Sequence, residues 1–380
     1  MKIIADTNIP FVKECFSSIG DVTLVGGRDI TPQLVKDADI LLVRSITRVN
    51  EELLAGSSVK FVSTATIGMD HIDRDYLDRG GIGFSSAPGS NANSVAEYVI
   101  AALLALGKKH KFTLEGKSIG IVGVGNVGSR VEKKTAALGM KVVLNDPPLK
   151  RKTGDDKYRP LDEALECDFV TMHTPLTFDG EDKTFHLACE KFFASMKKDS
   201  FFINTSRGAV HDTAALKKVL ASKSIAGAVL DVWENEPDID NELLLKADIS
   251  TPHIAGYSYD GKVAGMIMIY EAACRHFGLE ITHSINDFLP APEIPEITID
   301  QSIAEEQTII HDTVQSVYVI NRDDFNTREI LIVEPQGRGK WFDDLRKTYP
   351  VRREFQNTKV VIEDKESKLA KKLTGIGFKI

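Results

Sequence analysis

Cysteine is scarce in this chain. The sequence of 380 residues contains four cysteines, Cys15, Cys167, Cys189 and Cys274, which lie far apart and form no CxxC pair. A chain of this length does not need disulfides to be stable, so the pattern argues against a disulfide-rich secreted scaffold and favours reduced thiols. The sequence also lacks an HExxH motif and any cluster of cysteine and histidine, so no metal site is expected.

An excess of positive charge and long apolar runs are also missing. The formal net charge is −8 at pH 7, which argues against general binding to nucleic acid or to anionic membranes. The most apolar helical stretch, VIAALLAL, is far too short to span a bilayer. The start of the chain, MKIIADTNIP, lacks the apolar core and cleavage site of a signal peptide. We therefore expect a cytoplasmic protein without nucleic-acid or membrane partners.

Alternating strand-like and helix-like segments dominate the sequence. In the first ninety residues, strand-like pieces such as KIIAD and ADILLVRS alternate with pieces of helical spacing, and a second series of the same kind starts at KSIGIVG. Such alternation predicts parallel sheets that are covered by helices on both faces. The expected fold class is α/β, with two doubly wound parallel-sheet domains. The apolar segment between the two series, SNANSVAEYVIAALLALGKKH, is expected as one long buried helix.

The character of the sequence changes after about residue 285. The stretch INDFLPAPEIPEITID is rich in proline and indicates a linker. Beyond it, REILIVEP, VRREF and KVVIED are expected as strands with helices between them, which predicts a third, small α+β domain. Short strands leave sheet edges that a second copy of the chain can cover, so we expect residues 286–380 to form a dimerisation domain.

A glycine-rich turn follows the first strand of the second series. In IGIVGVGNVGSR, Gly123, Gly125 and Gly128 have GxGxxG spacing, and Asp146 ends the next strand, KVVLND. This context predicts a dinucleotide site in which the three glycines make the tight turn, admit a pyrophosphate and let the helix pack on the sheet. Asp146 is suited to the ribose hydroxyls and would repel a 2′-phosphate, so NAD is favoured over NADP. The alternatives are a glycine turn without a ligand and Asp146 as a helix cap.

Three loops of the second series carry residues suited to catalysis. Arg207 in INTSRGAVHD, Glu236 in AVLDVWENEP and His253 in STPHIAGYS all follow predicted strands, whose carboxyl ends meet at one edge of the sheet. Histidine can accept a hydroxyl proton near neutral pH, a carboxylate can orient its ring, and arginine binds a carboxylate through two parallel hydrogen bonds. The set predicts oxidation of a 2-hydroxy acid. Taken alone, Arg207 could instead form a surface ion pair, and Glu236 could be a solvated loop residue.

Four motifs together resemble those of the D-isomer-specific 2-hydroxyacid dehydrogenases. They are VGVGNVGSR, NTSRGAVHD, DVWENEP and TPHIAG, and the resemblance extends over essentially residues 1–280. It implies that Arg207 binds the substrate carboxylate, that His253 is the acid/base and that Glu236 supports His253. The residues implied to approach the NAD cofactor are Gly123, Gly125, Asn126, Val127, Gly128, Asp146, Thr174, Thr205, Ser206, Asp231 and Gly256.

The same resemblance implies a domain arrangement. A flavodoxin-like substrate domain is expected from residues 1–93 and 257–285, and a Rossmann NAD domain from residues 94–256. The chain returning past Ser258 is expected to complete the first domain. The family likeness also implies a homodimer.

A narrower likeness points to one branch of this family. The segments KIIADTNIPF, LLVRSITRVN, FVSTATIGMDHID and GYSYDGK resemble members that oxidise a phosphorylated four-carbon 2-hydroxy acid at C2, in the synthesis of pyridoxal 5′-phosphate. This likeness implies that Ser45, Thr66 and Tyr257 bind the substrate. Arg44, and more weakly Arg48, follow the strand ILLV and are candidates for the phosphate.

Other interpretations stay open at the level of the sequence. The segment GRGK, Gly337 to Lys340, is a weaker phosphate candidate that would reach over from a partner subunit. Another family member, such as a 3-phosphoglycerate dehydrogenase with a regulatory C-terminal domain, is one alternative function. A non-catalytic NAD-sensing binding protein on the same scaffold is the alternative from another class.

Overall fold

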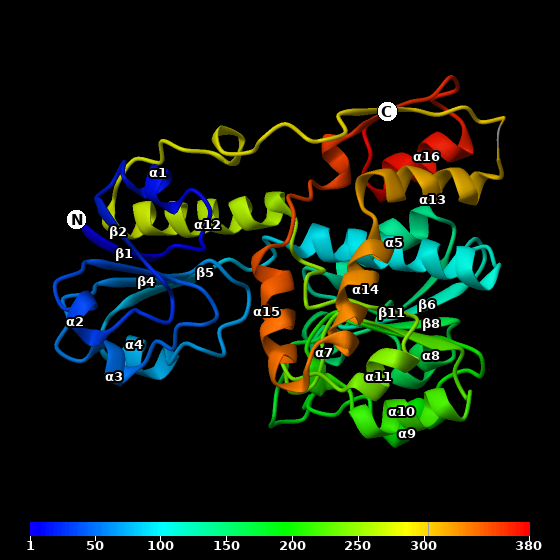
Figure 1. Cartoon of the computed structure of the whole chain (residues 1–380), viewed down its shortest axis with the longest axis horizontal. Helices are drawn as coiled ribbons and strands as arrows, with labels where there is room; N and C mark the ends of the chain where they lie inside the picture. The colour runs from blue at the N-terminus through cyan, green and yellow to red at the C-terminus, as the bar shows by residue number, and fades with distance from the viewer. Residues whose placement is uncertain (303) are drawn as a thin grey trace. The chain divides into compact units, whose positions relative to one another are not determined.

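The computed structural model describes residues 1–302 and 304–380 and divides into two compact units (Figure 1). Unit 1 comprises Met1–Asn91 and Ser258–Ala291, and unit 2 comprises Ala92–Tyr257 and Pro292–Ile380. In the described part of the chain, no helix is long and apolar enough to cross a membrane.

Unit 1 is built on a five-stranded sheet in the order β2-β1-β3-β4-β5, in which all neighbouring strands are parallel. Its strands are β1 (Lys2–Asp6), β2 (Asp21–Val25), β3 (Ile40–Val43), β4 (Phe61–Thr64) and β5 (Gly83–Ser86). Its helices are α1 (Val12–Phe16), α2 (Pro32–Val35), α3 (Glu51–Leu54), α4 (Arg74–Arg79), α12 (Tyr259–Phe277) and the 3-10 turn η2 (Ile285–Asp287). This sheet confirms the predicted doubly wound α/β class for the first series.

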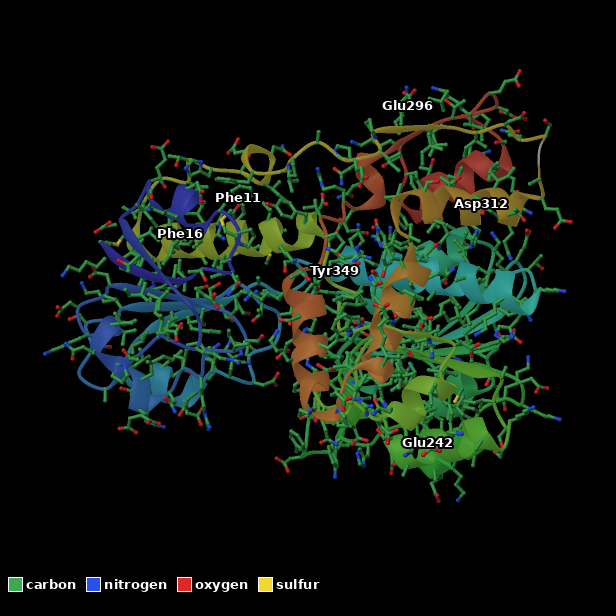
Figure 2. The ribbon with its side chains drawn as sticks, in the orientation of Figure 1. Phe11, Phe16, Glu242, Glu296, Asp312 and Tyr349 are labelled. Atoms are coloured by element: carbon green, nitrogen blue, oxygen red, sulfur yellow. The ribbon has the colours of Figure 1, made fainter. Side chains whose placement is uncertain are left out.

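The chain from Ser258 to Ala291 returns to unit 1. Helix α12 packs on β4, β5 and α1. Fully buried Phe16, labelled on α1 in Figure 2, meets the ring of Tyr270 edge-on at a centroid distance of 5.4 Å. Burying such large aromatic side chains supplies much of the hydrophobic stabilisation of a sheet–helix core.

Unit 2 is built on a six-stranded parallel sheet in the order β11-β10-β9-β8-β6-β7. Its strands are β6 (Ser118–Val122), β7 (Lys141–Asn145), β8 (Phe169–Met172), β9 (Phe201–Asn204), β10 (Gly227–Leu230) and β11 (Ile249–Ser250). The helices up to residue 257 are α5 (Ala92–His110), α6 (Gly128–Ala137), α7 (Pro147–Thr153), α8 (Leu161–Leu165), α9 (Glu190–Ser195), α10 (Thr213–Ala221), α11 (Asn241–Lys246) and the 3-10 turn η1 (Gly208–Val210).

The strand order of unit 2 reverses between β6 and β8. The chain first places β7 on one side of β6 and then returns to place β8 on the other side. Ligands of open α/β sheets bind outside the carboxyl ends of the strands at such a reversal. The predicted long helix is α5, whose residues from Ser94 to Gly107 are buried and pack on α6.

The C-terminal segment from Pro292 to Ile380 is grouped with unit 2. Its elements are β12 (Glu296–Thr298), α13 (Glu306–Val317), α14 (Ile320–Arg328), η3 (Glu329–Ile332), η4 (Pro335–Gly337), α15 (Arg338–Lys347), η5 (Phe355–Asn357), β13 (Lys359–Val361) and α16 (Lys368–Ile376). Helix α13 packs on α5, α16 on α6, and α14 on β11. These contacts show how the segment packs within unit 2, and a dimerisation domain over residues 286–380 stays a prediction.

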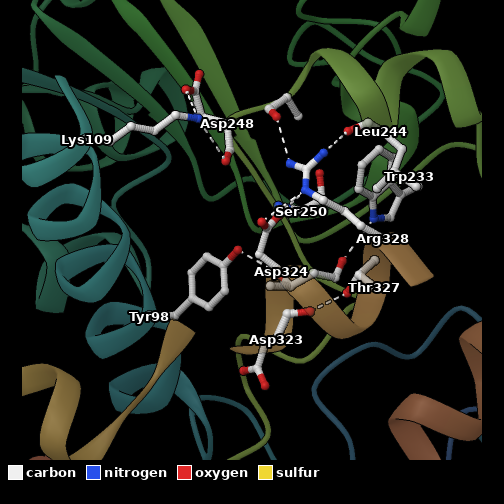
Figure 3. Close-up of polar contacts among 12 residues, drawn as sticks. Tyr98, Lys109, Trp233, Leu244, Asp248, Ser250, Asp323, Asp324, Thr327 and Arg328 are labelled. Carbon is white, nitrogen blue, oxygen red and sulfur yellow. Dashed lines mark hydrogen bonds and ion pairs between the residues drawn. The ribbon is translucent and has the colours of Figure 1, made fainter. Parts of the chain in front are cut away.

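Polar contacts tie α14 to the edge of the six-stranded sheet (Figure 3). Arg328 donates to the carbonyl oxygens of Leu244 at 2.7 Å and Ala247 at 2.8 Å. Asp324 accepts a hydrogen bond from the Ser250 backbone N–H at 2.7 Å. An edge strand offers unpaired backbone groups, and α14 covers those of β11.

Two predicted C-terminal strands are wrong. REILIVEP forms the end of α14 and η3, and VRREF forms extended chain and the start of η5. A short β-branched run cannot be distinguished from a buried helical turn by periodicity alone, and Ile330 is buried in this turn. Part of the expected linker is a strand, because β12 pairs with β13 in a two-stranded parallel sheet. The small α+β character of the segment is confirmed by these elements.

Candidate active site

The glycine turn follows β6 and opens α6. Gly123 has φ of 89°, and a Cβ atom there would lie 2.7 Å from the carbonyl oxygen of His173. A Cβ at Gly128 would lie 2.1 Å from the carbonyl oxygen of Gly123, whereas one at Gly125 would meet nothing within 4 Å. Each glycine therefore fits the role that the motif predicts: tight turn, open approach and close packing. Asn126 and Val127 lie in this turn, with Val127 as the N-cap of α6.

Asp146 lies directly after β7 and is held on both of its oxygens. Oδ2 accepts from the Val124 N–H at 2.8 Å, in the glycine turn, and Oδ1 accepts from the Leu149 N–H at 2.9 Å. Asp146 is thus the N-cap of α7, which was the alternative role. A carboxylate oxygen can accept more than one hydrogen bond, so the cap leaves capacity for ribose hydroxyls.

Two residues after β8 border the glycine turn. The hydroxyl oxygen of Thr174 is buried and has no hydrogen-bond partner within the described residues. His173 is enclosed by Thr171 Oγ1 at 3.0 Å and Thr205 Oγ1 at 3.2 Å, and burial lowers the pKa of His173 to about 3, so its ring is neutral. An unsatisfied hydroxyl beside an open glycine cradle at the sheet reversal fits a dinucleotide.

Arg207 follows β9 on a loop that Asn204 fixes. The Asn204 side chain donates to the Arg207 carbonyl oxygen at 3.0 Å and accepts from the Ser206 N–H at 3.0 Å. The guanidinium of Arg207 donates to the Ser206 carbonyl oxygen at 2.8 Å, and no ion pair joins it to a carboxylate of the described residues. Its remaining N–H groups are suited to an anionic ligand.

Asp231 holds the loop that carries His253. This fully buried carboxylate accepts from the backbone N–H groups of Ile254 at 2.8 Å and Ala255 at 3.0 Å, and from the Thr251 hydroxyl at 2.6 Å. Burial raises the pKa of Asp231 despite these donors. The observed partners give Asp231 a positioning role in the loop, whereas the family resemblance implied an approach to the cofactor.

His253 and Glu236 form a hydrogen-bonded pair. Nδ1 of His253 lies 2.7 Å from Oε2 of Glu236, and the Trp233 N–H donates to Oε1 at 2.9 Å. Burial would raise the pKa of Glu236, but the charge and hydrogen bonds of His253 and the Trp233 N–H lower it overall. A proton on Nδ1 faces the carboxylate and leaves Nε2 as an acceptor. The pair can therefore take up a proton and stabilise the resulting imidazolium.

His253 has left-handed backbone geometry, with φ of 58°. Such a conformation costs a non-glycine residue about 1–3 kcal/mol and persists only where the surroundings impose it. Here the Asp231 contacts impose it, together with the hydrogen bond from the His253 N–H to the Asp231 carbonyl oxygen at 2.7 Å. The loop then turns through Gly256, closed by the hydrogen bond from the Tyr257 N–H to the Ile254 carbonyl oxygen at 2.8 Å.

Three residues of the C-terminal segment contact this loop and were missed from the sequence. The Arg352 guanidinium donates to the Ala255 carbonyl oxygen at 2.7 Å. The ring of Tyr349, just beyond α15 (Figure 2), meets the ring of Tyr257 edge-on at 5.9 Å, and the Arg346 guanidinium lies 6.0 Å from the Tyr257 ring centroid. No local pattern marks these residues, because their proximity to the loop depends on how α14 and α15 pack.

The GRGK segment has other partners. Arg338 donates to the Val333 carbonyl oxygen at 3.0 Å, and the largely exposed Lys340 pairs with Asp344 one turn along α15. These contacts within its own segment account for both cations.

The predicted substrate residues of unit 1 lie at the carboxyl edge of its sheet. Arg44 and Ser45 follow β3, and Thr66 follows β4. Arg44 lies 3.5 Å from the Asn8 carbonyl oxygen beyond β1, and the Thr66 hydroxyl lies 2.7 Å from that of Thr64. Ser45 and Arg48 are exposed. The structure brings the first three to one end of neighbouring strands, as their positions predict.

Comparisons with known proteins agree with the geometry of unit 2. Residues 102–255 match the family described as D-isomer specific 2-hydroxyacid dehydrogenase, NAD binding domain, and residues 288–377 match a family described as a domain of unknown function (DUF3410). Among solved structures, NAD+-bound 3-phosphoglycerate dehydrogenase of Entamoeba histolytica is similar with a TM-score of 0.63 and 26% identity, covering 76% of this chain and 99% of that chain. D-lactate dehydrogenase of Aquifex aeolicus, complexed with NAD and lactic acid, has a TM-score of 0.59 and 26% identity, covering 73% and 96%.

Curated relatives match over the full length. Erythronate-4-phosphate dehydrogenase of Hahella chejuensis is 41% identical over 380 residues, covering 100% of this chain and 99% of that protein. Erythronate-4-phosphate dehydrogenase of Escherichia coli O1:K1 / APEC is 44% identical over 379 residues, covering 100% and 98%. With the NAD-binding fold and the predicted motifs in place, this chain belongs to the erythronate-4-phosphate dehydrogenase family of NAD-dependent D-isomer-specific 2-hydroxyacid dehydrogenases.

Proposed function

We propose that this protein oxidises 4-phospho-D-erythronate at C2 to (R)-3-hydroxy-2-oxo-4-phosphooxybutanoate, with NAD, in the synthesis of pyridoxal 5′-phosphate. The observation that carries the chemistry is the pair of His253 and Glu236, at 2.7 Å, on a loop fixed at the carboxyl edge of the sheet. The identity of the acid is supported by the full-length relatives named erythronate-4-phosphate dehydrogenase.

His253 is the general base of the proposed reaction. Nε2 takes the proton of the C2 hydroxyl while Glu236, hydrogen-bonded to Nδ1, stabilises the imidazolium that forms. Arg207 binds the substrate carboxylate through its guanidinium and so orients C2. NAD, when bound, supplies the hydride acceptor. The neutral His173 and the Asp231 network keep the surrounding loops rigid.

The cofactor is held by the loops at the reversal of the sheet in this proposal. Backbone groups of the glycine turn take the pyrophosphate, and Asp146 takes the ribose hydroxyls while capping α7. The contributing residues are Gly123, Gly125, Asn126, Val127, Gly128, Asp146, Thr174, Thr205, Ser206 and Gly256. Substrate binding by Tyr257, Ser45, Thr66 and Arg44 stays a prediction of the family resemblance.

A substrate comparison tests the assignment. Purified protein with stoichiometric NAD is given 4-phospho-D-erythronate, unphosphorylated erythronate or 3-phosphoglycerate, with and without a 2-oxo acid that reoxidises NADH. We expect the phosphorylated four-carbon acid to be oxidised fastest. A preference for 3-phosphoglycerate favours the related dehydrogenase activity, and no reduction of NAD by any of the acids favours a non-catalytic NAD-binding protein.

A cytoplasmic homodimer completes the proposal. Exposed apolar side chains occur in the C-terminal segment, where Phe325 is 63%, Ile332 84% and Val351 57% exposed. The proposed partner that covers these side chains is a second copy of the chain, as the family resemblance implies. Light scattering should give twice the chain mass for the intact protein and a smaller mass for a Phe325→Asp, Ile332→Asp variant. A dimer that is unaffected by both changes argues against this interface.

A further inference from the structure

We propose that Arg346, on α15, is a substrate-binding residue that takes the terminal phosphate of the substrate. The inference rests on the proposed function and deepens it. It assigns the second anion of the substrate to a side chain in the C-terminal segment, outside the motifs of the NAD-binding family.

The position of Arg346 brings a second guanidinium to the catalytic loop. Its guanidinium lies 6.0 Å from the ring centroid of Tyr257, and Tyr257 follows His253 by four positions on the loop that Asp231 fixes. The ring of Phe342 flanks Arg346 at 5.9 Å on α15, and Tyr349 packs edge-on against Tyr257. These aromatic contacts hold the long side chain in place and limit the entropy that ligand binding would cost.

Donor capacity remains on Arg346. Its Nε is buried and has no hydrogen-bond partner in the described part of the chain. Its Nη1 lies 3.6 Å from the carboxylate of Asp343, which is beyond hydrogen-bond range, and Asp343 is 44% exposed. This ion pair involves Nη1 and leaves Nε, so the guanidinium keeps a donor for a ligand.

Charge explains why the cation is retained beside the catalytic pair. Burial alone lowers the pKa of Arg346, but the charge and hydrogen bond of Tyr257 and the carboxylates of Glu236 and Asp343 raise it overall, so the group is cationic. The proposed substrate has two anionic ends, a carboxylate next to the reacting C2 and a phosphate on C4. Arg207 accounts for the carboxylate, and a second planar guanidinium beside Tyr257 matches phosphate oxygens.

Kinetics with paired substrates test the role. The measured quantity is the ratio of kcat/KM for 4-phospho-D-erythronate to kcat/KM for unphosphorylated erythronate, in the full-length protein with NADH recycling. In Arg346→Ala this ratio should fall on the order of 100-fold, because a charge-assisted hydrogen-bond pair is lost. Arg346→Lys should recover part of the ratio, since it keeps the charge without the fork. Lys347→Ala, an exposed cation on the same helix, is the matched control and should leave the ratio unchanged.

A binding measurement separates this inference from the proposed function. Titration calorimetry with inorganic phosphate, in the presence of NADH, should show binding that Arg346→Ala and Arg346→Gln lose while NADH affinity is kept. An unchanged substrate ratio with unchanged phosphate binding overturns the assignment. An equal loss with both substrates and a displaced pH–rate profile also overturns it, in favour of a positioning role through Glu236. If the intact protein does not oxidise 4-phospho-D-erythronate, the proposed function fails, and the phosphate titration still decides on Arg346.

Discussion

Two histidine–glutamate pairs in unit 2 have nearly the same geometry. Nδ1 of His253 lies 2.7 Å from Glu236, and Nε2 of His186 lies 2.7 Å from Glu234. Both histidines have left-handed backbone, with φ of 58° and 52°. The side chains are 32% and 20% exposed in the first pair and 33% and 20% in the second. Distance, strain and burial therefore do not distinguish them.

The surroundings of the two pairs differ. The other ring nitrogen of His186, Nδ1, lies 3.9 Å from the carboxylate of Asp212, and its ring stacks on Phe185 at 4.1 Å. The second oxygen of Glu234 accepts from the Thr213 N–H at the start of α10. The pair of His186 and Glu234 is therefore bordered by the Asp212 carboxylate and by the start of α10.

The pair of His253 and Glu236 has a cationic and aromatic neighbourhood instead. Arg346 contributes positive charge near Glu236, and Tyr257 lies on the same loop. An anionic substrate would be repelled by the carboxylates around His186. It would be attracted by the positive charge near His253. The charge around a histidine–carboxylate pair, more than its internal geometry, indicates which pair does chemistry.

Replacing each histidine in turn should give the largest difference in rate between the two pairs. His253→Asn removes the proposed base, so we expect hydride transfer to fall about 10³-fold, within the range that general bases contribute. NADH binding, followed by fluorescence titration, should be nearly unchanged. His186→Asn is the matched control, and its rate should stay close to that of the wild type. Comparable losses in both variants would contradict the assignment.

Replacing the glutamates should give a smaller difference in rate. Glu236→Gln keeps the size of the side chain but removes the charge that stabilises the imidazolium, and its one amide oxygen can accept from only one of the two donors, His253 and the Trp233 N–H. We therefore expect a loss of about 10- to 100-fold and a displaced pH–rate profile. Glu234→Gln should leave the pH–rate profile of the wild type in place. An unchanged profile in Glu236→Gln would make Glu236 only a loop residue.

Asp146 lies outside both pairs, and replacing it tests whether the choice between NAD and NADP is independent of them. Asp146→Asn keeps an N-cap side chain for α7 but removes the repulsion toward a 2′-phosphate. We expect discrimination between NAD and NADP to relax about tenfold. The amide oxygen can keep the Leu149 N–H bond that caps α7, but its NH2 group cannot accept from the Val124 N–H, so we expect a small loss of thermal stability. Asp146→Ala should relax discrimination too and lose about 1 kcal/mol of stability from the cap. A wild-type preference for NADP would refute the role of Asp146.

Acid should remove the contribution that each pair makes to the stability of the folded protein. These are the smallest effects that we predict. Burial raises the pKa values of Glu236 and Glu234, but their partners lower both overall: His253 and the Trp233 N–H at Glu236, and the Thr213 hydroxyl and N–H together with His186 at Glu234. A lowered pKa contributes stability above the unfolded value, and this contribution is lost as the pH falls through the folded value. The melting temperatures of Glu236→Gln and Glu234→Gln should therefore approach that of the wild type as the pH is lowered below about 4. A difference that grows with acid would contradict the pKa directions.

Much of the fold and part of the site follow from local sequence patterns. The β-branched segments predict the strands of both sheets, and the GxGxxG spacing predicts the turn in which each glycine has its expected surroundings. His253, Glu236 and Arg207 are found after strands because parallel strands all end at one edge of their sheet. The prediction fails at REILIVEP, where the buried Ile330 fits a helical turn as well as a strand.

The sequence by itself determined the two doubly wound series, the cofactor turn and the residue types of the catalytic loops, because these depend on spacing over a few residues. Only the tertiary structure decided that the C-terminal segment packs into unit 2, that Asp231 holds the His253 loop and that Arg346 lies beside Tyr257. It also decided that a second histidine has an equal carboxylate partner in a different electrostatic setting. Contacts between residues distant in sequence depend on the packing of whole helices, which no local spacing encodes.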